Sequence, residues 1–170
     1  MSATHDPDDP ASARAPVDPD IDLHVPGQRV EWSRHRFVLP AIALGGMAGA
    51  GARHAAAERW PTATDGMPWT TLGVNAVGCL LIGVLMVVVM EVGGTHPLLR
   101  PFVGVGVLGG FTTFSTYAVD TVSLVDAGRP AVALGYGAGT LLVALVAVAA
   151  GVLVARAAVR VAARAGERPA

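Results

Sequence analysis

Four long hydrophobic stretches, separated by short polar turns, make up most of the chain. They cover residues 37–57, 70–90, 98–125 and 131–155. A hydrophobic helix of about 20 residues is long enough to cross the apolar part of a bilayer. The pattern therefore predicts an all-α membrane protein with four transmembrane helices.

The third stretch has a polar interruption near its middle, Gly109–Tyr117, with the sequence GGFTTFSTY. Two adjacent glycines lower the helix preference by about 1 kcal/mol each relative to alanine, and they permit a change of backbone direction. Backbone groups released at membrane depth need partners from the protein or from a polar cavity. We therefore predict that the third helix is broken near mid-membrane, at a site that holds an ion or a polar solute.

Polar segments flank the hydrophobic part. Residues 1–33 are rich in Asp and Pro and contain few large apolar side chains, so we expect a disordered polar tail. This tail lacks the apolar core of a secretory signal peptide. Residues 157–170 form an Arg-rich C-terminal tail, and residues 34–156 form the four-helix transmembrane domain.

The basic residues, which are all arginines, are unevenly distributed. Four spans place both termini on one side of the membrane, and that side carries most of the arginines, which predicts cytoplasmic termini and a multi-pass protein of the cell membrane. The net charge of −1 gives no general attraction to nucleic acid. The terminal side has Arg29, Arg34, Arg36, Arg100, Arg156, Arg160, Arg164 and Arg168, and the other side has Arg59 and Arg129, with Arg53 near it and expected to snorkel outward.

Neutral polar groups inside the hydrophobic stretches are the main candidates for chemistry. Asn75 is the one strongly polar residue within the second stretch, and its amide either makes an interhelical hydrogen bond or lines a pore. The hydroxyls of the interruption and Thr140 add further donors, and donors favour an anion. The ring edges of Phe114 and Tyr117 carry partial positive charge and can also contact an anion, although core packing is the alternative for this pair.

Signatures of catalysis are missing from the sequence. There is no pair of carboxylates within the hydrophobic stretches, no His/Cys cluster with metal-ligand spacing and no nucleophile elbow. The glycines do not follow a strand, as they would in a nucleotide-binding loop. The single cysteine, Cys79, is interpreted as a small core residue. We predict that the protein is not an enzyme.

Three motifs together resemble the Fluc/CrcB family of fluoride channels. They are Gly45–Arg53, Gly73–Gly78 and Gly109–Tyr117, and the resemblance extends over about residues 37–155. The GGFTTFST sequence is the specific part of it. The resemblance implies a fluoride-selective channel that exports fluoride passively from the cytoplasm and so lowers its toxicity. It also implies an antiparallel dimer with two pores, either a homodimer or a heterodimer with a homologous subunit.

The resemblance also assigns roles by position. The backbone carbonyls of Gly109 and Thr112 match the ligands of a structural sodium ion (Na+) at the dimer interface, and hard oxygen ligands suit such a cation. Three positions depart from the family pattern: Tyr117 stands in place of phenylalanine, Ala144 in place of a hydroxyl residue found in some members, and Asp120 in place of glutamate. The residues that match the fluoride path are Asn75, Phe114, Tyr117, Ser115, Thr116, Tyr136 and Thr140.

Two other functions suit a small four-helix membrane protein. A small proton-coupled multidrug exporter needs a membrane-embedded carboxylate, and the first hydrophobic stretch contains none. A non-transporting membrane assembly protein has no need for Asn75 and a hydroxyl-rich interruption at mid-depth. The arginine excess on the terminal side also predicts a biased orientation, in which case an antiparallel dimer would need a second homologue of opposite bias.

Overall fold

A computed structural model gives the fold of residues 36–62, 66–92 and 95–166. The chain divides into two compact units, residues 1–36 and 37–170, and all the described helices belong to the second unit. The predicted disordered tail over residues 1–33 lies outside the described residues, as do Arg29, Arg34 and Arg168.

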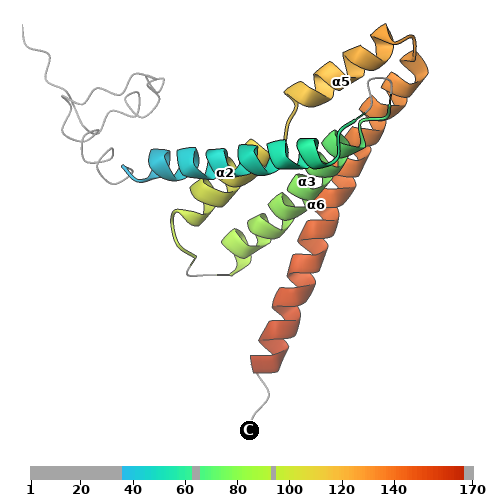
Figure 1. Ribbon diagram of the computed structural model, residues 1–170. Coiled ribbons are helices and arrows are strands. Elements are labelled where there is room, and N and C mark those ends of the chain that lie inside the picture. The colour runs from blue at the N-terminus through green and yellow to red at the C-terminus, as the bar shows by residue number, and fades with distance from the viewer. Residues whose placement is uncertain (1–35, 63–65, 93–94, 167–170) are drawn as a thin grey trace, which may run out of the picture. The chain divides into compact units, whose positions relative to one another are not determined.

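The described part of the chain is built from helices and contains no β-strand (Figure 1). This confirms the predicted all-α class. The first, second and fourth hydrophobic stretches each form one helix, and the third stretch forms three shorter segments, of which the first is a π-helix. The elements are α2 (Val38–Arg59), α3 (Trp69–Glu91), η2 (Arg100–Leu108), α4 (Gly109–Phe111), α5 (Ser115–Asp126) and α6 (Pro130–Gly166).

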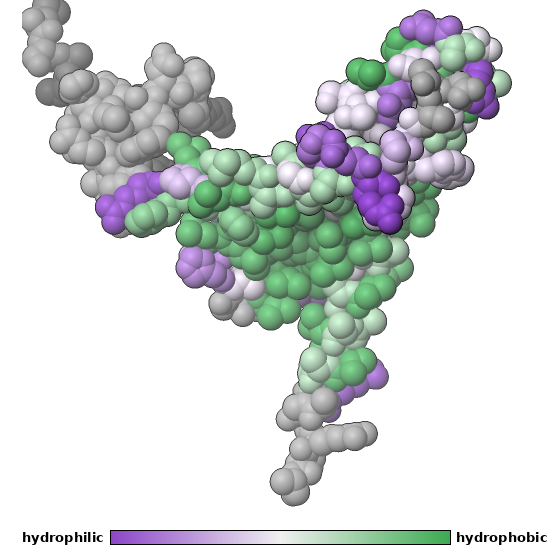
Figure 2. All heavy atoms as spheres, viewed as in Figure 1, coloured by the Kyte–Doolittle hydropathy of each residue, from purple (hydrophilic) through white to green (hydrophobic). Residues whose placement is uncertain are grey.

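Three helical segments of the described chain are long and apolar enough to cross a membrane, namely residues 69–91, 100–126 and 130–164. The fourth expected span, α2, has 22 residues, which is a sufficient length. It is not among the three, and its sequence combines many glycines with Arg53, His54, Glu58 and Arg59 toward its end. Figure 2 shows hydrophobic residues over much of the visible surface where α2, α3 and α6 lie. Exposed apolar surface of this extent indicates contact with lipid or with another subunit.

Glycines allow α2 to lie directly against the backbone of the third segment. A Cβ atom at Gly45 would overlap the carbonyl oxygen of Phe102, and a Cβ atom at Gly49 would overlap that of Val107. Small residues permit such close approach between membrane helices. The packing of α2 on η2 and α4 follows from these glycines, as their spacing predicts.

A second glycine contact joins α3 and α6. A Cβ atom at Gly83 would overlap the carbonyl oxygen of Val148, and a Cβ atom at Gly151 would overlap that of Leu80. α5 also packs on α6, where Leu124 and Tyr136 are almost fully buried. The two halves of the third segment therefore rest on different helices, η2 and α4 on α2, and α5 on α6.

The third segment is interrupted after Phe111, which confirms the predicted break. The two glycines that were expected to permit the break are not where it occurs, because Gly109 and Gly110 are both helical. The backbone leaves the helix at Thr112, with φ −74° and ψ 157°, an extended conformation that is open to any residue. Gly110 instead makes room for α2, since a Cβ atom there would lie 2.5 Å from the carbonyl oxygen of Gly46.

The turn between α5 and α6 depends on Gly128, which has a positive φ of 74°. The Gly128 amide donates to the carbonyl oxygen of Val125, and the Arg129 amide donates to that of Leu124, both at 2.9 Å. This pair of bonds is the Schellman arrangement that ends many helices. Pro130 then begins α6 at a position where its missing N–H group costs little.

Candidate functional site

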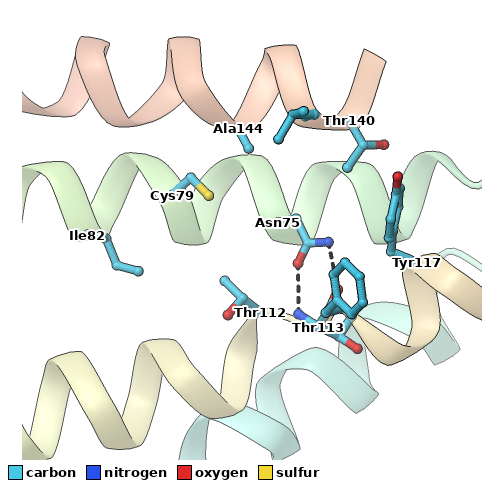
Figure 3. Close-up of a pocket in the computed structure, with 10 residues that line it drawn as sticks. Asn75, Cys79, Ile82, Thr112, Thr113, Tyr117, Thr140 and Ala144 are labelled. Atoms are coloured by element: carbon cyan, nitrogen blue, oxygen red, sulfur yellow. Dashed lines mark hydrogen bonds between the residues drawn. The ribbon is translucent and has the colours of Figure 1, made fainter. Parts of the chain in front are cut away.

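Asn75 of α3 binds the broken backbone of the third segment through both ends of its amide. Its Oδ1 accepts a hydrogen bond from the Thr113 amide at 2.8 Å. Its Nδ2 donates to the Thr113 carbonyl oxygen at 2.9 Å, and both bonds are drawn in Figure 3. The structure thus shows an interhelical hydrogen bond for Asn75. Asn75 also lines a pocket. Contact between its amide and a solute in that pocket remains a prediction.

Hydroxyl groups gather where α5 begins. Thr113 Oγ1 accepts a hydrogen bond from the Thr116 amide at 3.1 Å, which satisfies one of the free amides at the start of α5. The same oxygen donates to Thr116 Oγ1 at 2.9 Å and lies 3.3 Å from Ser115 Oγ. The three side chains form a polar cluster beside the amide of Asn75.

Three aromatic rings form a row from the surface into the subunit. Phe114 is 79% exposed, and its ring centroid lies 5.5 Å from that of Tyr117. Tyr117 lies at the same centroid distance from Tyr136, which is completely buried. The Tyr117 hydroxyl donates to the carbonyl oxygen of Gly137 at 3.2 Å.

Asp120 of α5 binds two hydroxyl groups from other helices. Its Oδ2 accepts a hydrogen bond from Thr71 Oγ1 at 2.7 Å and another from the Tyr136 hydroxyl at 3.3 Å. Tyr136 therefore has a carboxylate partner inside the subunit. These bonds connect α3, α5 and α6.

A pocket of about 430 Å³ lies between α3, the break and α6. Thr140 is 7% exposed, and its Oγ1 has no hydrogen-bond partner among the described residues. A buried hydroxyl without a partner is costly, so it points to a polar occupant. The lining residues, seen in Figure 3, are Asn75, Cys79, Ile82, Thr112, Thr113, Phe114, Tyr117, Thr140, Leu141 and Ala144.

Arg53 faces the break from α2, so the expectation that it snorkels outward is wrong. Its Nε donates to the carbonyl oxygen of Gly110 at 3.2 Å, an oxygen that a continuous helix would have paired with the Phe114 amide. The sequence does contain a signal for this, because Arg53 follows Gly45 and Gly49 at intervals of four and so shares their face. A pocket of about 140 Å³ next to it is lined by Arg53, His54, Ala57, Thr70, Thr71, Val74, Thr113 and Thr116.

The break also releases backbone carbonyl groups. The Thr113 amide, which would pair with Gly109 in a continuous helix, binds Asn75 instead. The Thr116 amide, which would pair with Thr112, binds Thr113 Oγ1. Within the described ranges, no hydrogen bond reaches the carbonyl oxygens of Gly109 and Thr112, so both are chemically able to bind a hard cation.

Comparison with known proteins identifies the family. Residues 40–152 match the family described as CrcB-like protein, Camphor Resistance (CrcB). The chain belongs to the CrcB family. The matched range contains α3, the break and the lining of both pockets, so the geometry above is that of a CrcB protein.

Curated CrcB relatives carry the name fluoride-specific ion channel. FluC 2 of Streptomyces avermitilis is 55% identical over 125 residues, which cover 73% of this chain and 79% of that protein. FluC 1 of Streptomyces coelicolor is 58% identical over 120 residues, covering 71% and 78%. FluC of Paracoccus denitrificans is 44% identical over 123 residues, covering 72% and 96%.

The structure of this CrcB protein brings some of the predicted site residues together and separates others. Asn75, Phe114, Tyr117 and Thr140 line the larger pocket, as does the predicted sodium ligand Thr112. Thr116 lines the smaller pocket. Ser115, Tyr136 and Gly109 line neither pocket. The roles assigned to these residues remain predictions.

Proposed function

We propose that this CrcB protein is a fluoride-selective channel that lets fluoride leave the cytoplasm passively and so lowers its toxicity. The larger pocket carries the proposal, because an unpaired buried Thr140 hydroxyl, the amide of Asn75 and two aromatic rings meet there. The names of the CrcB relatives support fluoride as the solute.

The pocket chemistry suits a small anion. Neutral hydroxyl and amide donors replace part of the water shell that fluoride loses, and a narrow path with fixed donors discriminates by size and dehydration. The edges of Phe114 and Tyr117 add partial positive charge without a fixed ion. Arg53 binds the Gly110 carbonyl oxygen at the break and lines the smaller pocket. Its positive charge attracts anions to that pocket.

A sodium ion is proposed at the carbonyl oxygens of Gly109 and Thr112. These oxygens lack hydrogen-bond partners among the described residues, and hard oxygen ligands suit sodium. A bound cation would hold the broken backbone together and add positive charge near the path.

The channel is proposed to be an antiparallel dimer, either of identical chains or with a homologous subunit. Phe114 lines the pocket and is 79% exposed, so a second subunit would cover its outer side. Streptomyces avermitilis has relatives numbered FluC 2 and FluC 3, which is compatible with pairing between different chains. The proposal includes a location in the cell membrane with both termini in the cytoplasm, and no catalytic turnover is expected.

Fluoride efflux from liposomes tests the function. Purified protein is reconstituted with internal potassium fluoride, valinomycin is added to carry the compensating potassium, and released fluoride is followed with a selective electrode. Fast fluoride release, slow chloride release under matched conditions and no effect of a pH gradient are expected. Proton-driven transport of a drug substrate without fluoride release would favour a proton-coupled multidrug exporter, and no flux of either solute would favour a membrane assembly protein.

A further inference from the structure

The hydroxyl group of Tyr117 is directed to α6. It donates to the carbonyl oxygen of Gly137 at 3.2 Å, and in Figure 3 the hydroxyl end of Tyr117 points toward α6. A tyrosine hydroxyl has one proton to donate, so the bond to Gly137 occupies the donor that a free tyrosine would offer to an anion. Tyr117 therefore presents its ring to the pocket.

Gly137 is suited to this contact because it has no side chain. A Cβ atom at Gly137 would lie 3.3 Å from the hydroxyl oxygen of Tyr117, which is tighter than an ordinary carbon–oxygen contact. The neighbouring glycines of α6, Gly135 and Gly139, have open space where a Cβ atom would be. The missing side chain at Gly137 is thus matched to one particular neighbour.

The Tyr117 ring packs against two other aromatic rings. The ring centroids of Phe114 and of the buried Tyr136 each lie 5.5 Å from that of Tyr117. A displacement of the Tyr117 hydroxyl would therefore shift the ring on which Phe114 packs, and both rings line the pocket.

We propose that Gly137 is a positioning residue for the pocket. Its carbonyl oxygen binds the Tyr117 hydroxyl, and its lack of a side chain leaves room for that hydroxyl, so that Tyr117 offers the pocket an apolar ring edge as a phenylalanine would. The inference rests on the proposed fluoride function and concerns the same pocket.

Four variants test the inference in the liposome assay: Tyr117→Phe, Gly137→Ala, the double variant Tyr117→Phe/Gly137→Ala, and Gly139→Ala as the matched control. Tyr117→Phe keeps the ring but lacks the hydroxyl, so its fluoride rate is the reference for a pocket without the Tyr117–Gly137 contact. Gly137→Ala should conduct about fivefold more slowly than this reference, because the new methyl group crowds the Tyr117 hydroxyl and overpacking displaces the ring. The double variant removes the hydroxyl that the new methyl group displaces, so its rate should return to that of Tyr117→Phe. Gly139→Ala should conduct like the wild type.

Two results would overturn the inference: a Gly137→Ala rate equal to that of Gly139→Ala, or a loss that Tyr117→Phe does not restore. If Gly137→Ala does not fold, the double variant decides, since it must both fold and conduct. A wild-type protein without fluoride flux would contradict the proposed function instead. The same comparison is then made on the midpoint of thermal unfolding, which Gly137→Ala should lower and the added Tyr117→Phe should restore.

Discussion

Asn75 and Thr113 form a reciprocal pair, in which the side-chain amide both accepts from the Thr113 amide at 2.8 Å and donates to its carbonyl at 2.9 Å. Only Asn and Gln carry a neutral donor and a neutral acceptor side by side. Asn75 therefore replaces the helical neighbours that Thr113 lacks at the break. One side chain both supports the irregular backbone and lines the pocket.

Replacing Asn75 by alanine should slow fluoride efflux and lower the midpoint of thermal unfolding. The change leaves two partly buried backbone groups without partners, at a cost of about 1–3 kcal/mol for each group. Asn75→Asp should also be impaired, because a carboxylate can accept from the Thr113 amide but cannot donate to its carbonyl. Thr113→Ser keeps the backbone pair and the hydroxyl, and it serves as the control. Wild-type efflux and stability in Asn75→Ala would contradict the assigned role.

Phe114→Ile should abolish fluoride passage without unfolding the protein. The side chain is 79% exposed, so it contributes little to the stability of the subunit, while isoleucine lacks the positive ring edge that can contact an anion. Efflux and thermal unfolding are measured on the same preparation. Val119→Ile changes another exposed residue of α5, 63% accessible and outside the pocket, and should leave efflux unchanged. Fluoride passage through Phe114→Ile at the wild-type rate would remove this ring from the path.

Thr140→Val should reduce fluoride efflux and leave stability unchanged or slightly higher. Valine has nearly the same shape as threonine, and the Thr140 hydroxyl it removes is buried without a partner in the described chain, so its loss relieves a desolvation cost of about 1–3 kcal/mol. Thr140→Ser retains the hydroxyl and should conduct. A marked fall in the unfolding midpoint of Thr140→Val would show that the hydroxyl has a structural partner, contrary to this prediction.

Gly49→Ala and Gly51→Ala should affect stability in opposite directions. Both residues lie in α2, but a Cβ atom at Gly49 would overlap the carbonyl oxygen of Val107, whereas Gly51 has open space around it. Overpacking costs about 1–3 kcal/mol, and alanine in an unobstructed helical position gains up to about 1 kcal/mol over glycine. Thermal unfolding in detergent compares the two variants. Equal midpoints would show that α2 does not rest on the third segment through Gly49.

Membrane insertion should be biased, with both termini in the cytoplasm. Among the described residues, Arg100, Arg156, Arg160 and Arg164 lie on the terminal side by the order of the helices, and Arg59 and Arg129 lie on the other. Accessibility of a tag at either terminus, measured in intact cells and in inverted vesicles, reports the orientation. Equal numbers of both orientations would remove the argument for a second, oppositely inserted homologue.

The sequence predicted the helices well because hydrophobic length and polar turns are local properties. It also predicted the break and the polar residue opposite it, Asn75. The Asn75 amide and the hydroxyls of Thr113, Ser115 and Thr116 cost free energy at membrane depth unless they have polar partners. It did not predict that the backbone leaves the helix at Thr112 while Gly109 and Gly110 stay helical. Gly110 is needed because α2 packs closely against it at Gly46, and this contact between two helices has no local signal in the sequence.

Other features depend on contacts between distant parts of the chain. The choice of Thr113 as the partner of Asn75 spans 38 positions, and the bond between Arg53 and Gly110 spans 57. The π-helix η2 has no local signal in its sequence that sets it apart from an ordinary helix. The Tyr117 hydroxyl likewise binds a carbonyl group 20 positions away, and this contact depends on the packing of α5 against α6.

The two halves of the third segment are attached to different supports, and this has a mechanical consequence. η2 and α4 rest on α2 through backbone-to-backbone contacts at glycines, whereas α5 rests on α6. Any sliding of one support past the other would be absorbed at residues 112–114, which are also lining residues of the pocket. Asn75 binds Thr113 within this stretch, so a side chain of α3 also fixes the pocket lining that lies between the two supports.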